Sequence, residues 1–346
     1  MSGTVRHFIT TQSLEGGELT EVLDEAIQLR SRVPRNDLAG KVVGLIFFNP
    51  SLRTRTSMEI AVASLGGKTV VMDVGAGVWP MEWLEGIRME GAAAEHVRDA
   101  ANVLSRYCDA IAVRSFPDGK DWKEDRLDPV LQAFVRHSTV PVINMESALT
   151  HPLQALADLL AIRDVARDPR GKRLTLAWCT HPKALPLSVP NSVALIASAA
   201  GMTLTIACPP GYDLPEEVLT QVEGNNRKSG GTIRIVHDLA EGMEGAAFVY
   251  AKSWGSLRTY GRATEGLRDR ERYRDWRITE PLMARTDGGR FMHCLPIRRN
   301  VVADDAVIDA PTSLVYAQAA NRLAVQKAVL LRLLASQPAS KRKEAR

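Results

Sequence analysis

Hydroxyl and arginine side chains gather at residues 51–55 (Ser-Leu-Arg-Thr-Arg), directly after the apolar run Lys41–Phe48 and before a helical pattern that begins at about Met58. The first turn of a helix carries N–H groups without backbone partners and the positive end of the helix dipole. Arginine adds paired donors that match phosphate oxygens. The stretch therefore predicts an anion site, and the plainer alternative is an N-cap serine beside two solvated arginines.

Three further polar motifs also stand at or just past the ends of apolar runs. They are residues 113–116 (Val-Arg-Ser-Phe), 150–154 (Thr-His-Pro-Leu-Gln) and 293–296 (His-Cys-Leu-Pro). Ligands of open parallel sheets bind beyond the carboxyl ends of the strands, so these motifs are expected at one site. Taken alone, His151 before a proline indicates a helix cap. Cys294 lacks an accompanying His–Asp pattern, which argues against a nucleophile.

The elements that must position these motifs alternate between short β-branched runs and helical patterns. Strands are expected at Lys41–Phe48, Thr69–Asp73, Ala110–Val113, Val140–Asn144, Arg173–Trp178, Thr203–Ala207, Thr232–Val236, Ala247–Tyr250 and Arg290–His293. Helical spacing is seen at Glu18–Arg30, Glu95–Tyr107, Asp128–His137, Pro152–Val165 and Ala317–Leu334. Such alternation favours parallel sheets with helices on both faces. We therefore expect an α/β fold class with two doubly wound parallel-sheet domains.

The order of the strands also suggests where the domains divide. The first four close a unit near residue 150, and a second series begins after the turn at 167–171 (Arg-Asp-Pro-Arg-Gly). We expect domains at 1–150 and 151–336, with the last helix returning to the first domain. Residues 337–346 are basic, and we expect them to form a disordered tail.

Composition excludes several classes of protein. The chain has 346 residues, 45% of them hydrophobic and 24% charged, with a net charge of +4, which is too small to indicate a nucleic-acid binder. We see neither an apolar stretch long enough for a bilayer nor a secretory signal. The four cysteines show no metal-ligand spacing, so we expect reduced thiols and a cytoplasmic protein. Residues 75–77 (Gly-Ala-Gly) lack the third glycine of a dinucleotide fingerprint.

The four motifs, in this order, resemble those of the aspartate/ornithine carbamoyltransferases, in which Ser-x-Arg-Thr-Arg is the carbamoyl-phosphate loop. The resemblance extends from His7 to the last helix. Plain ornithine enzymes carry Asp-x-x-x-Ser-Met-Gly where this chain has residues 250–255 (Tyr-Ala-Lys-Ser-Trp-Gly). Together with residues 78–80, 144–146 and the proline-rich 181–186, this segment resembles the N-acylornithine carbamoyltransferases.

This resemblance implies a specific reaction. A carbamoyl group passes from carbamoyl phosphate to the δ-amine of N-acetyl- or N-succinyl-L-ornithine in arginine biosynthesis, with neither metal nor cofactor. It also implies a homotrimer with shared active sites and a knotted second domain, threaded near Pro182–Pro190. A plain ornithine carbamoyltransferase and a catalytically degenerate carbamoyl-phosphate-binding protein remain the alternatives.

The resemblance also implies residue roles. Carbamoyl phosphate is expected to contact Ser51, Leu52, Arg53, Thr54, Arg55, Trp79, Arg114, His151, Gln154, Cys294, Leu295 and Arg322, with Trp79 supplied by a neighbouring subunit. The expected catalytic residues are Arg53, Arg114, His151 and, through its backbone, Cys294. The acylornithine site is expected to include Ala94, Glu146, His181, Asn191, Lys252 and Leu295.

Two departures bear on the acyl group. Acetylornithine-specific relatives carry Glu-Glu-His where this chain reads Ala94-Glu95-His96, and they carry lysine where it has Val302. A carboxylate at position 94 would repel the free carboxylate of a succinyl group, whereas alanine removes that repulsion. We therefore predict that N-succinylornithine is accepted, and leave open whether N-acetylornithine is the physiological substrate.

Overall fold

The computed structural model describes residues 5–31, 33 and 35–335 of the chain. The tail expected at 337–346 lies outside these residues. Among the described helices, none is both long enough and apolar enough to cross a membrane.

The first sheet has four parallel strands in the order β2-β1-β5-β6. Their bounds are β1 (Val42–Phe47), β2 (Lys68–Asp73), β5 (Ala110–Arg114) and β6 (Val142–Glu146). Side chains alternate between the two faces, as a strand requires. Val43, Leu45 and Phe47 pack with α1 (Glu18–Gln28), α2 (Leu52–Ser64) and α13 (Val315–Leu334). Ile46 packs on the opposite face, with α3 (Val97–Tyr107) and α5 (Pro129–His137).

The second sheet has five parallel strands in the order β11-β10-β7-β8-β9. They are β7 (Arg173–Trp178), β8 (Thr203–Ala207), β9 (Thr232–Val236), β10 (Phe248–Lys252) and β11 (Arg290–Met292). Leu174 and Leu176 pack with α7 (Ser188–Ala199) and α8 (Glu216–Ser229). Ala177 packs on the other face, with α9 (Leu239–Met243) and α12 (Asp305–Ile308). The expected α/β class, with parallel sheets covered on both faces, is confirmed.

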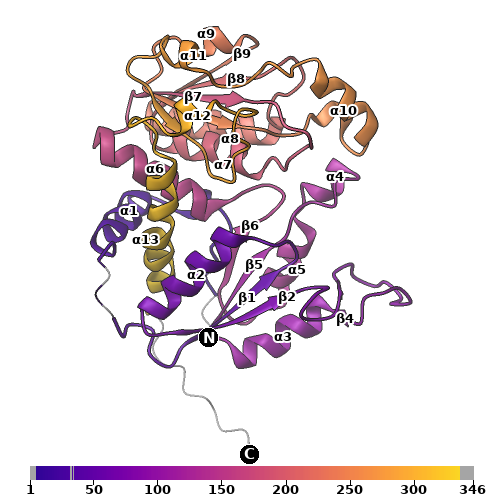
Figure 1. Ribbon diagram of the computed structural model, residues 1–346. Helices are drawn as coiled ribbons and strands as arrows, with labels where there is room; N and C mark the ends of the chain where they lie inside the picture. The colour runs from indigo at the N-terminus through magenta and orange to yellow at the C-terminus, as the bar shows by residue number, and fades with distance from the viewer. Residues whose placement is uncertain (1–4, 32, 34, 336–346) are drawn as a thin grey trace, which may run out of the picture.

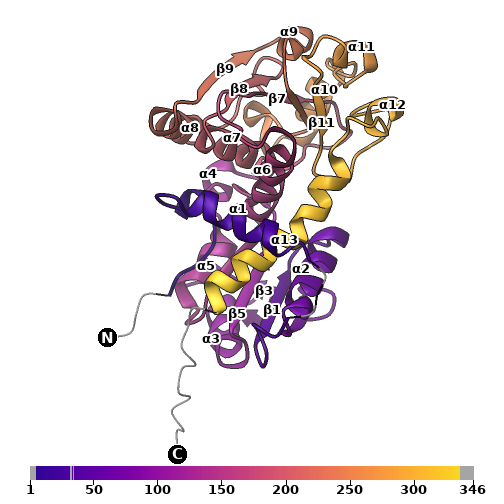
Figure 2. The ribbon, with the colours of Figure 1, turned by 90° about the vertical axis from the view of Figure 1, so that its left-hand side faces the viewer.

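Two long helices connect the halves of the molecule. α6 (Pro152–Ala166) follows the last strand of the first sheet and is buried from Pro152 to Ile162. α13 begins beside β11 and runs back along α6, α1 and α2, so the end of the described chain lies against the first sheet (Figure 1 and Figure 2). These two helices place residues from both sheets at one junction.

Shorter elements complete the fold. They are the strands β3 (Met81–Glu82) and β4 (Glu95–His96), the helices α4 (Trp122–Asp125), α10 (Ala263–Glu271) and α11 (Glu280–Met283), and the 3₁₀ turns at Thr11–Ser13 and Leu257–Thr259. β3 and β4 pair with each other in a loop that projects from the side of the first sheet (Figure 1).

The nine strands of the two main sheets lie within two residues of their predicted bounds. The predicted start of α2 was wrong. The helix begins at Leu52 and not at about Met58, because Ser51 acts as its N-cap and accepts a hydrogen bond from the Thr54 N–H at 3.1 Å. The 51–55 motif therefore forms the first turn of the helix.

Candidate functional site

A cavity of about 530 Å³ lies where the carboxyl ends of the two sheets meet. Its walls come from the first turn of α2, the ends of β5, β6 and β10, the start of α6, the loops after β7 and β11, and α13. The lining residues are Pro50, Ser51, Leu52, Arg53, Thr54, Arg114, Phe116, Glu146, His151, Gln154, His181, Leu185, Pro186, Ser188, Val189, Lys252, Cys294, Leu295, Pro296 and Arg322. Most of the residues expected from the sequence thus share one cavity.

Three arginines approach the first turn of α2 in this cavity. Arg114 is the last residue of β5. Arg322 lies on α13 and donates a hydrogen bond to the Thr54 hydroxyl at 2.9 Å. The Arg53 side chain makes no hydrogen bond or ion pair with any described residue. Burial lowers the pKa of Arg322 to about 10, and the neighbouring Arg114 and Arg53 charges contribute. Arg322 therefore remains cationic at neutral pH, and three guanidinium groups around one helix N-terminus favour an anion.

Glu146 balances part of this charge. Its carboxylate forms an ion pair with Arg114, and it accepts a hydrogen bond from the Ser188 hydroxyl at 2.8 Å. Burial acts to raise the pKa of Glu146, but the charges of Arg114 and Lys252 and the Ser188 hydrogen bond outweigh it and hold the pKa below its usual range. Glu146 is therefore an anion held between two sets of donors.

His151 begins α6 and is 3% exposed, which leaves it shielded from water. Burial lowers its pKa to about 3, although the Glu146 carboxylate acts to raise it; the charges of Arg322, Arg114 and Lys252 act in the same direction as burial. Its Nε2 lies 3.6 Å from a Glu146 oxygen, and its Nδ1 is buried without a partner among the described residues. A neutral imidazole at this position can donate one hydrogen bond and carries no charge that would attract a second anion.

The opposite wall combines an amide, an amine and a backbone turn. Gln154 accepts a hydrogen bond from Arg322 Nη1 at 3.1 Å. Lys252, at the end of β10, is 9% exposed and pairs with no described side chain. Cys294 and Leu295 lie in the turn after β11, and burial raises the pKa of the Cys294 thiol. A protonated thiol agrees with the interpretation that this segment acts through its backbone.

Two predicted residues have side chains that lie elsewhere. Arg55 leaves α2 on its outer side and pairs with Glu59 at 3.0 Å and Asp73 at 2.9 Å. Asn191 is buried on α7 and donates to the Leu149 carbonyl at 3.1 Å, which supports the turn before His151. Neither lines the cavity. Their roles in binding stay predictions.

Trp79 and Ala94 lie on the projecting loop that contains β3 and β4. Trp79 is 56% exposed, and its indole N–H donates to Glu95 at 2.6 Å. The Ala94 N–H donates to the Pro80 carbonyl at 3.1 Å. Within one chain, neither residue lines the cavity. Their roles in substrate binding, and the sharing of Trp79 with a neighbouring subunit, stay predictions.

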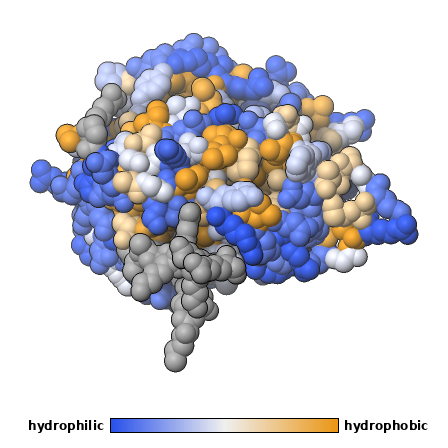
Figure 3. All heavy atoms as spheres, turned by 90° about the horizontal axis from the view of Figure 1, so that it is seen from below, coloured by the Kyte–Doolittle hydropathy of each residue, from blue (hydrophilic) through white to orange (hydrophobic). Residues whose placement is uncertain are grey.

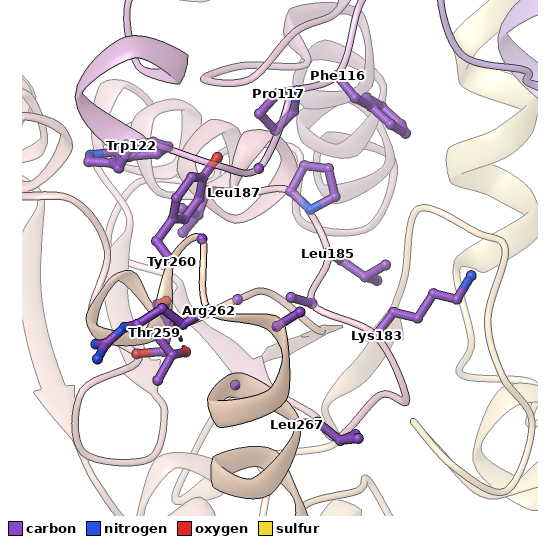
Figure 4. Close-up of a pocket in the computed structure, with 18 of the residues that line it drawn as sticks. Phe116, Pro117, Trp122, Lys183, Leu185, Leu187, Thr259, Tyr260, Arg262 and Leu267 are labelled. Carbon is purple, nitrogen blue, oxygen red and sulfur yellow. Dashed lines mark hydrogen bonds between the residues drawn. The ribbon is translucent and has the colours of Figure 1, made fainter.

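A second cavity, of about 590 Å³, adjoins the first behind the proline-rich loop 182–187 (Figure 4). Phe116, Leu185 and Pro186 line both cavities. On its far side Trp122 and Tyr260 stack edge to face, with ring centroids 5.5 Å apart. The loop is therefore a thin wall with open space on each side.

Sequence reasoning missed several contributors to the site. Phe116, Ser188 and Val189 line the cavity, and Asp158 and Gln318 hold lining residues in place. A carboxylate inside the apolar stretch 155–162 of α6 was a usable signal for Asp158. Gln318 offered none, because a glutamine on a long helix is usually solvated.

Comparison with known proteins agrees with this geometry. The model of the aspartate/ornithine carbamoyltransferase carbamoyl-phosphate-binding domain matches residues 6–164, and that of the Asp/Orn-binding domain matches residues 174–333. The chain is 43% identical over 334 residues to the N-acetylornithine carbamoyltransferase of Xanthomonas campestris, covering 96% of this chain and 98% of the relative. It is 37% identical over 322 residues to the N-succinylornithine carbamoyltransferase of Bacteroides thetaiotaomicron, covering 92% and 96%.

Among solved structures, one similar chain is a mutant N-acetyl-L-ornithine transcarbamylase with a glutamate replaced by alanine, complexed with carbamyl phosphate and N-succinyl-L-norvaline. It is 44% identical, covers 95% of this chain and 100% of its own, and superposes with a TM-score of 0.93.

Proposed function

The chain belongs to the aspartate/ornithine carbamoyltransferase family, and from this premise we propose that it carbamoylates an N-acylated L-ornithine. The carbamoyl group of carbamoyl phosphate passes to the δ-amine, which gives N-acyl-L-citrulline and phosphate. One observation carries this proposal. The cavity combines the N-terminus of α2, three arginines and a neutral histidine on one side with a lysine that pairs with no side chain in the described part of the chain on the other.

The phosphate end of the donor fits the first side. Arg53, Arg114 and the free N–H groups of α2 supply donors to a dianion, and Arg322 closes the site from α13. The Nε atoms of Arg114 and Arg322 are buried without partners among the described residues. A buried donor has already paid the free-energy cost of losing its hydrating water. A hydrogen bond from such a donor to a bound anion therefore stabilises the complex more than one from an exposed donor.

The transfer itself needs donors and orientation more than a protein nucleophile. The neutral δ-amine forms a bond to the carbamoyl carbon, the C–O bond to phosphate breaks, and the departing phosphate accepts the amine proton. Negative charge develops on the carbamoyl oxygen, where Arg53, Arg114 and His151 can donate. Removal of one such donor typically costs about 2.7–4 kcal/mol of transition-state stabilisation.

The second side is suited to the acylated amino acid. Lys252 offers a cation for its α-carboxylate, and Glu146 offers an acceptor. Ala94, if the projecting loop enters the neighbouring cavity, brings no carboxylate that would repel a succinyl group. The mutant relative bound to N-succinyl-L-norvaline also has alanine in place of a glutamate. These observations support acceptance of N-succinylornithine alongside N-acetylornithine.

The active protein is proposed to be a cytoplasmic homotrimer in arginine biosynthesis, with the 74–96 loop entering the neighbouring site and a knot in the second domain. Large apolar side chains exposed on α2 and on this loop support an interface between chains; they are Leu52, Ile60, Trp79, Leu84, Ile87 and Met89. Figure 3 shows hydrophobic side chains in contact with one another on one face of the molecule. Exposed apolar groups of this kind mark association surfaces.

One assay tests the proposal. The purified protein is given carbamoyl phosphate and, separately, L-ornithine, N-acetyl-L-ornithine and N-succinyl-L-ornithine, and the ureido product is measured as kcat/KM. We expect turnover of both acylated acceptors and little with ornithine. Fastest turnover of free ornithine would establish the plain ornithine enzyme instead. No product with any acceptor, despite bound carbamoyl phosphate, would indicate a degenerate binding protein. A preference above about tenfold for the acetyl substrate would contradict the argument from Ala94.

A further inference from the structure

Asp158 is the only acidic residue in the buried part of α6 and does not line the cavity. It is 2% exposed, and its carboxylate accepts three hydrogen bonds from three different elements. Gln154 Nε2 and Gln318 Nε2 both donate to Oδ1 at 2.7 Å, and the Tyr250 hydroxyl donates to Oδ2 at 2.9 Å. The carboxylate therefore joins α6, α13 and β10 at a single point.

The bond to Gln154 determines which way that amide faces. Because Nε2 is held by Asp158, Oε1 faces Arg322 and accepts its hydrogen bond at 3.1 Å. Arg322 in turn donates to Thr54 at the first turn of α2. Without the Asp158 acceptor, the amide would lose the partner that keeps its nitrogen away from the arginine.

The bond to Gln318 acts on the turn after β11. Gln318 Nε2 is held by Asp158, and its Oε1 accepts from the His293 N–H at 3.0 Å. His293 immediately precedes the Cys294–Leu295 turn, and its Nδ1 accepts from the Leu295 N–H at 2.8 Å. One carboxylate thus holds both Gln154, which lines the cavity, and Gln318, which supports the turn after β11, although residues 154 and 318 are 164 positions apart.

The charged and titratable groups around Asp158 fit this arrangement. Arg322 faces it from α13, the Tyr250 phenol from β10 and the Cys294 thiol from the turn after β11. Burial raises the pKa of Asp158 to about 7, although the three hydrogen bonds and Arg322 act to lower it. A carboxylate retained at this cost to stability, in a helix that is otherwise apolar here, points to a role beyond packing.

We propose that Asp158 is a positioning residue for carbamoyl transfer, which orients Gln154 and, through Gln318, the Cys294–Leu295 turn around the bound substrates. The inference rests on the proposed function. Asp158 makes no contact with substrate in this proposal. It influences kcat only through the positions of the Gln154 and Gln318 amides.

The test uses the full-length protein and a double-mutant cycle. Asp158→Ala removes the acceptor, and we expect kcat to fall roughly 100-fold, the size of effect that an ångström-scale misplacement produces. Asp158→Asn keeps one carbonyl oxygen for the two amides, so it should recover about a tenth of wild-type kcat. The double variant Asp158→Ala/Gln154→Ala should have a kcat only slightly below that of Gln154→Ala. Once the Gln154 amide is absent, loss of the carboxylate that orients it has little further effect.

Asp164 provides the matched control. It lies on the same helix, pairs with Arg30 at 2.6 Å and does not line the cavity, so Asp164→Asn and Asp164→Ala should keep wild-type kcat. Thermal melting and the far-UV spectrum verify that each variant is folded, and Asp158→Asn serves if the alanine variant is not. Wild-type kcat in folded Asp158→Asn and Asp158→Ala, or fully additive losses in the cycle, would overturn the inference. Absence of turnover in the wild-type protein would instead refute the proposed function.

Discussion

Arg53 and Arg55 stand two residues apart on α2, and their side chains leave the helix on different sides. Positions separated by two residues are about 200° apart around a helix, so both cannot face one cavity. Arg53 lines the cavity, whereas Arg55 pairs with Glu59 and Asp73. The sequence motif treats the two arginines alike, and the helix separates them.

The first prediction compares these two arginines. Arg53→Ala should lower kcat/KM for carbamoyl phosphate by roughly 100- to 1,000-fold, since it removes a donor to the phosphate and to the developing oxyanion. Arg55→Ala should change it by less than about fivefold, because it loses only exposed ion pairs. Steady-state kinetics with a saturating acylated acceptor measures both. An equal loss in Arg55→Ala would place its side chain in the site during turnover, as the motif alone suggests.

A second prediction concerns the charge of His151. Its unfolded pKa is near 6.5 and burial lowers the folded value to about 3, so the unfolded chain alone takes up a proton between these values. The contribution of His151 to stability is therefore fully present above pH 6.5 and is lost as the pH falls toward 3. Relative to His151→Asn, the wild-type free energy of unfolding should drop by about 1.4 kcal/mol for each pH unit below 6.5.

Denaturant titrations of both proteins at pH 7.5, 6.0 and 5.0 measure that difference. The His151→Asn side chain takes up no proton in this pH range. The variant therefore measures how all the other titrating groups change the free energy of unfolding, and it serves as the reference for the wild-type protein. A constant difference across the three pH values would show that the folded imidazole is protonated like an exposed one. In that case burial would not keep His151 neutral below pH 6.5.

At the scale of the elements, packing distances decide what each helix tolerates. Gly242 in α9 lies against the second sheet, where an added Cβ would be 2.5 Å from the Ala207 Cβ. Gly224 in α8 has open space, with its nearest neighbour, the Arg227 guanidinium, at 3.7 Å. The same residue type thus serves close packing in one helix and has no packing role in the other.

The third prediction tests this contrast. Gly242→Ala should lower the free energy of unfolding by about 1–3 kcal/mol, because α9 must move away from β8. Gly224→Ala should raise it by about 0.5–1 kcal/mol, since alanine loses less backbone entropy in a helix. Chemical denaturation of the two variants gives both values. Stabilisation by Gly242→Ala would mean that α9 packs less closely than its contacts indicate.

The elements also show why some boundaries were predictable. Strands were placed within two residues because most are short apolar runs, as burial inside a parallel sheet demands, although the edge strands β2 and β9 are more exposed. The start of α2 was missed because residues 52–57 carry no apolar periodicity, and the Ser51 cap decides where the helix begins. Local hydrogen bonding overrides periodicity at such ends.

At the scale of the whole molecule, two of the residues that the sequence assigns to the site are absent from the cavity of their own chain. Trp79 and Ala94 lie on a loop that projects from the first sheet and line no part of the cavity of their own chain. If the loop enters a neighbouring cavity, a single chain cannot form a complete site. Assembly and activity are then linked.

The fourth prediction uses this sharing. Arg114→Ala and Trp79→Ala should each form inactive trimers, because each site would lack either its own arginine or its neighbour's tryptophan. Subunits mixed in equal amounts after reversible dissociation should regain about one quarter of wild-type activity, the fraction of sites that combine an intact cavity with an intact loop. Light scattering measures the assembly. Recovery of no activity in verified hybrid trimers would show that each site is complete within one chain.

By itself, the sequence determined the elements, the α/β class and the four motifs that supply most of the cavity, because apolar periodicity and strand-end chemistry are local properties. Only the tertiary structure decided that Arg53 faces inward and Arg55 outward, that Asn191 supports a turn, and that Asp158 joins Gln154 to Gln318. Each of these depends on distances between segments far apart in the chain. Side-chain direction and buried partners arise when α6, α13 and the two sheets pack together, which no local pattern records.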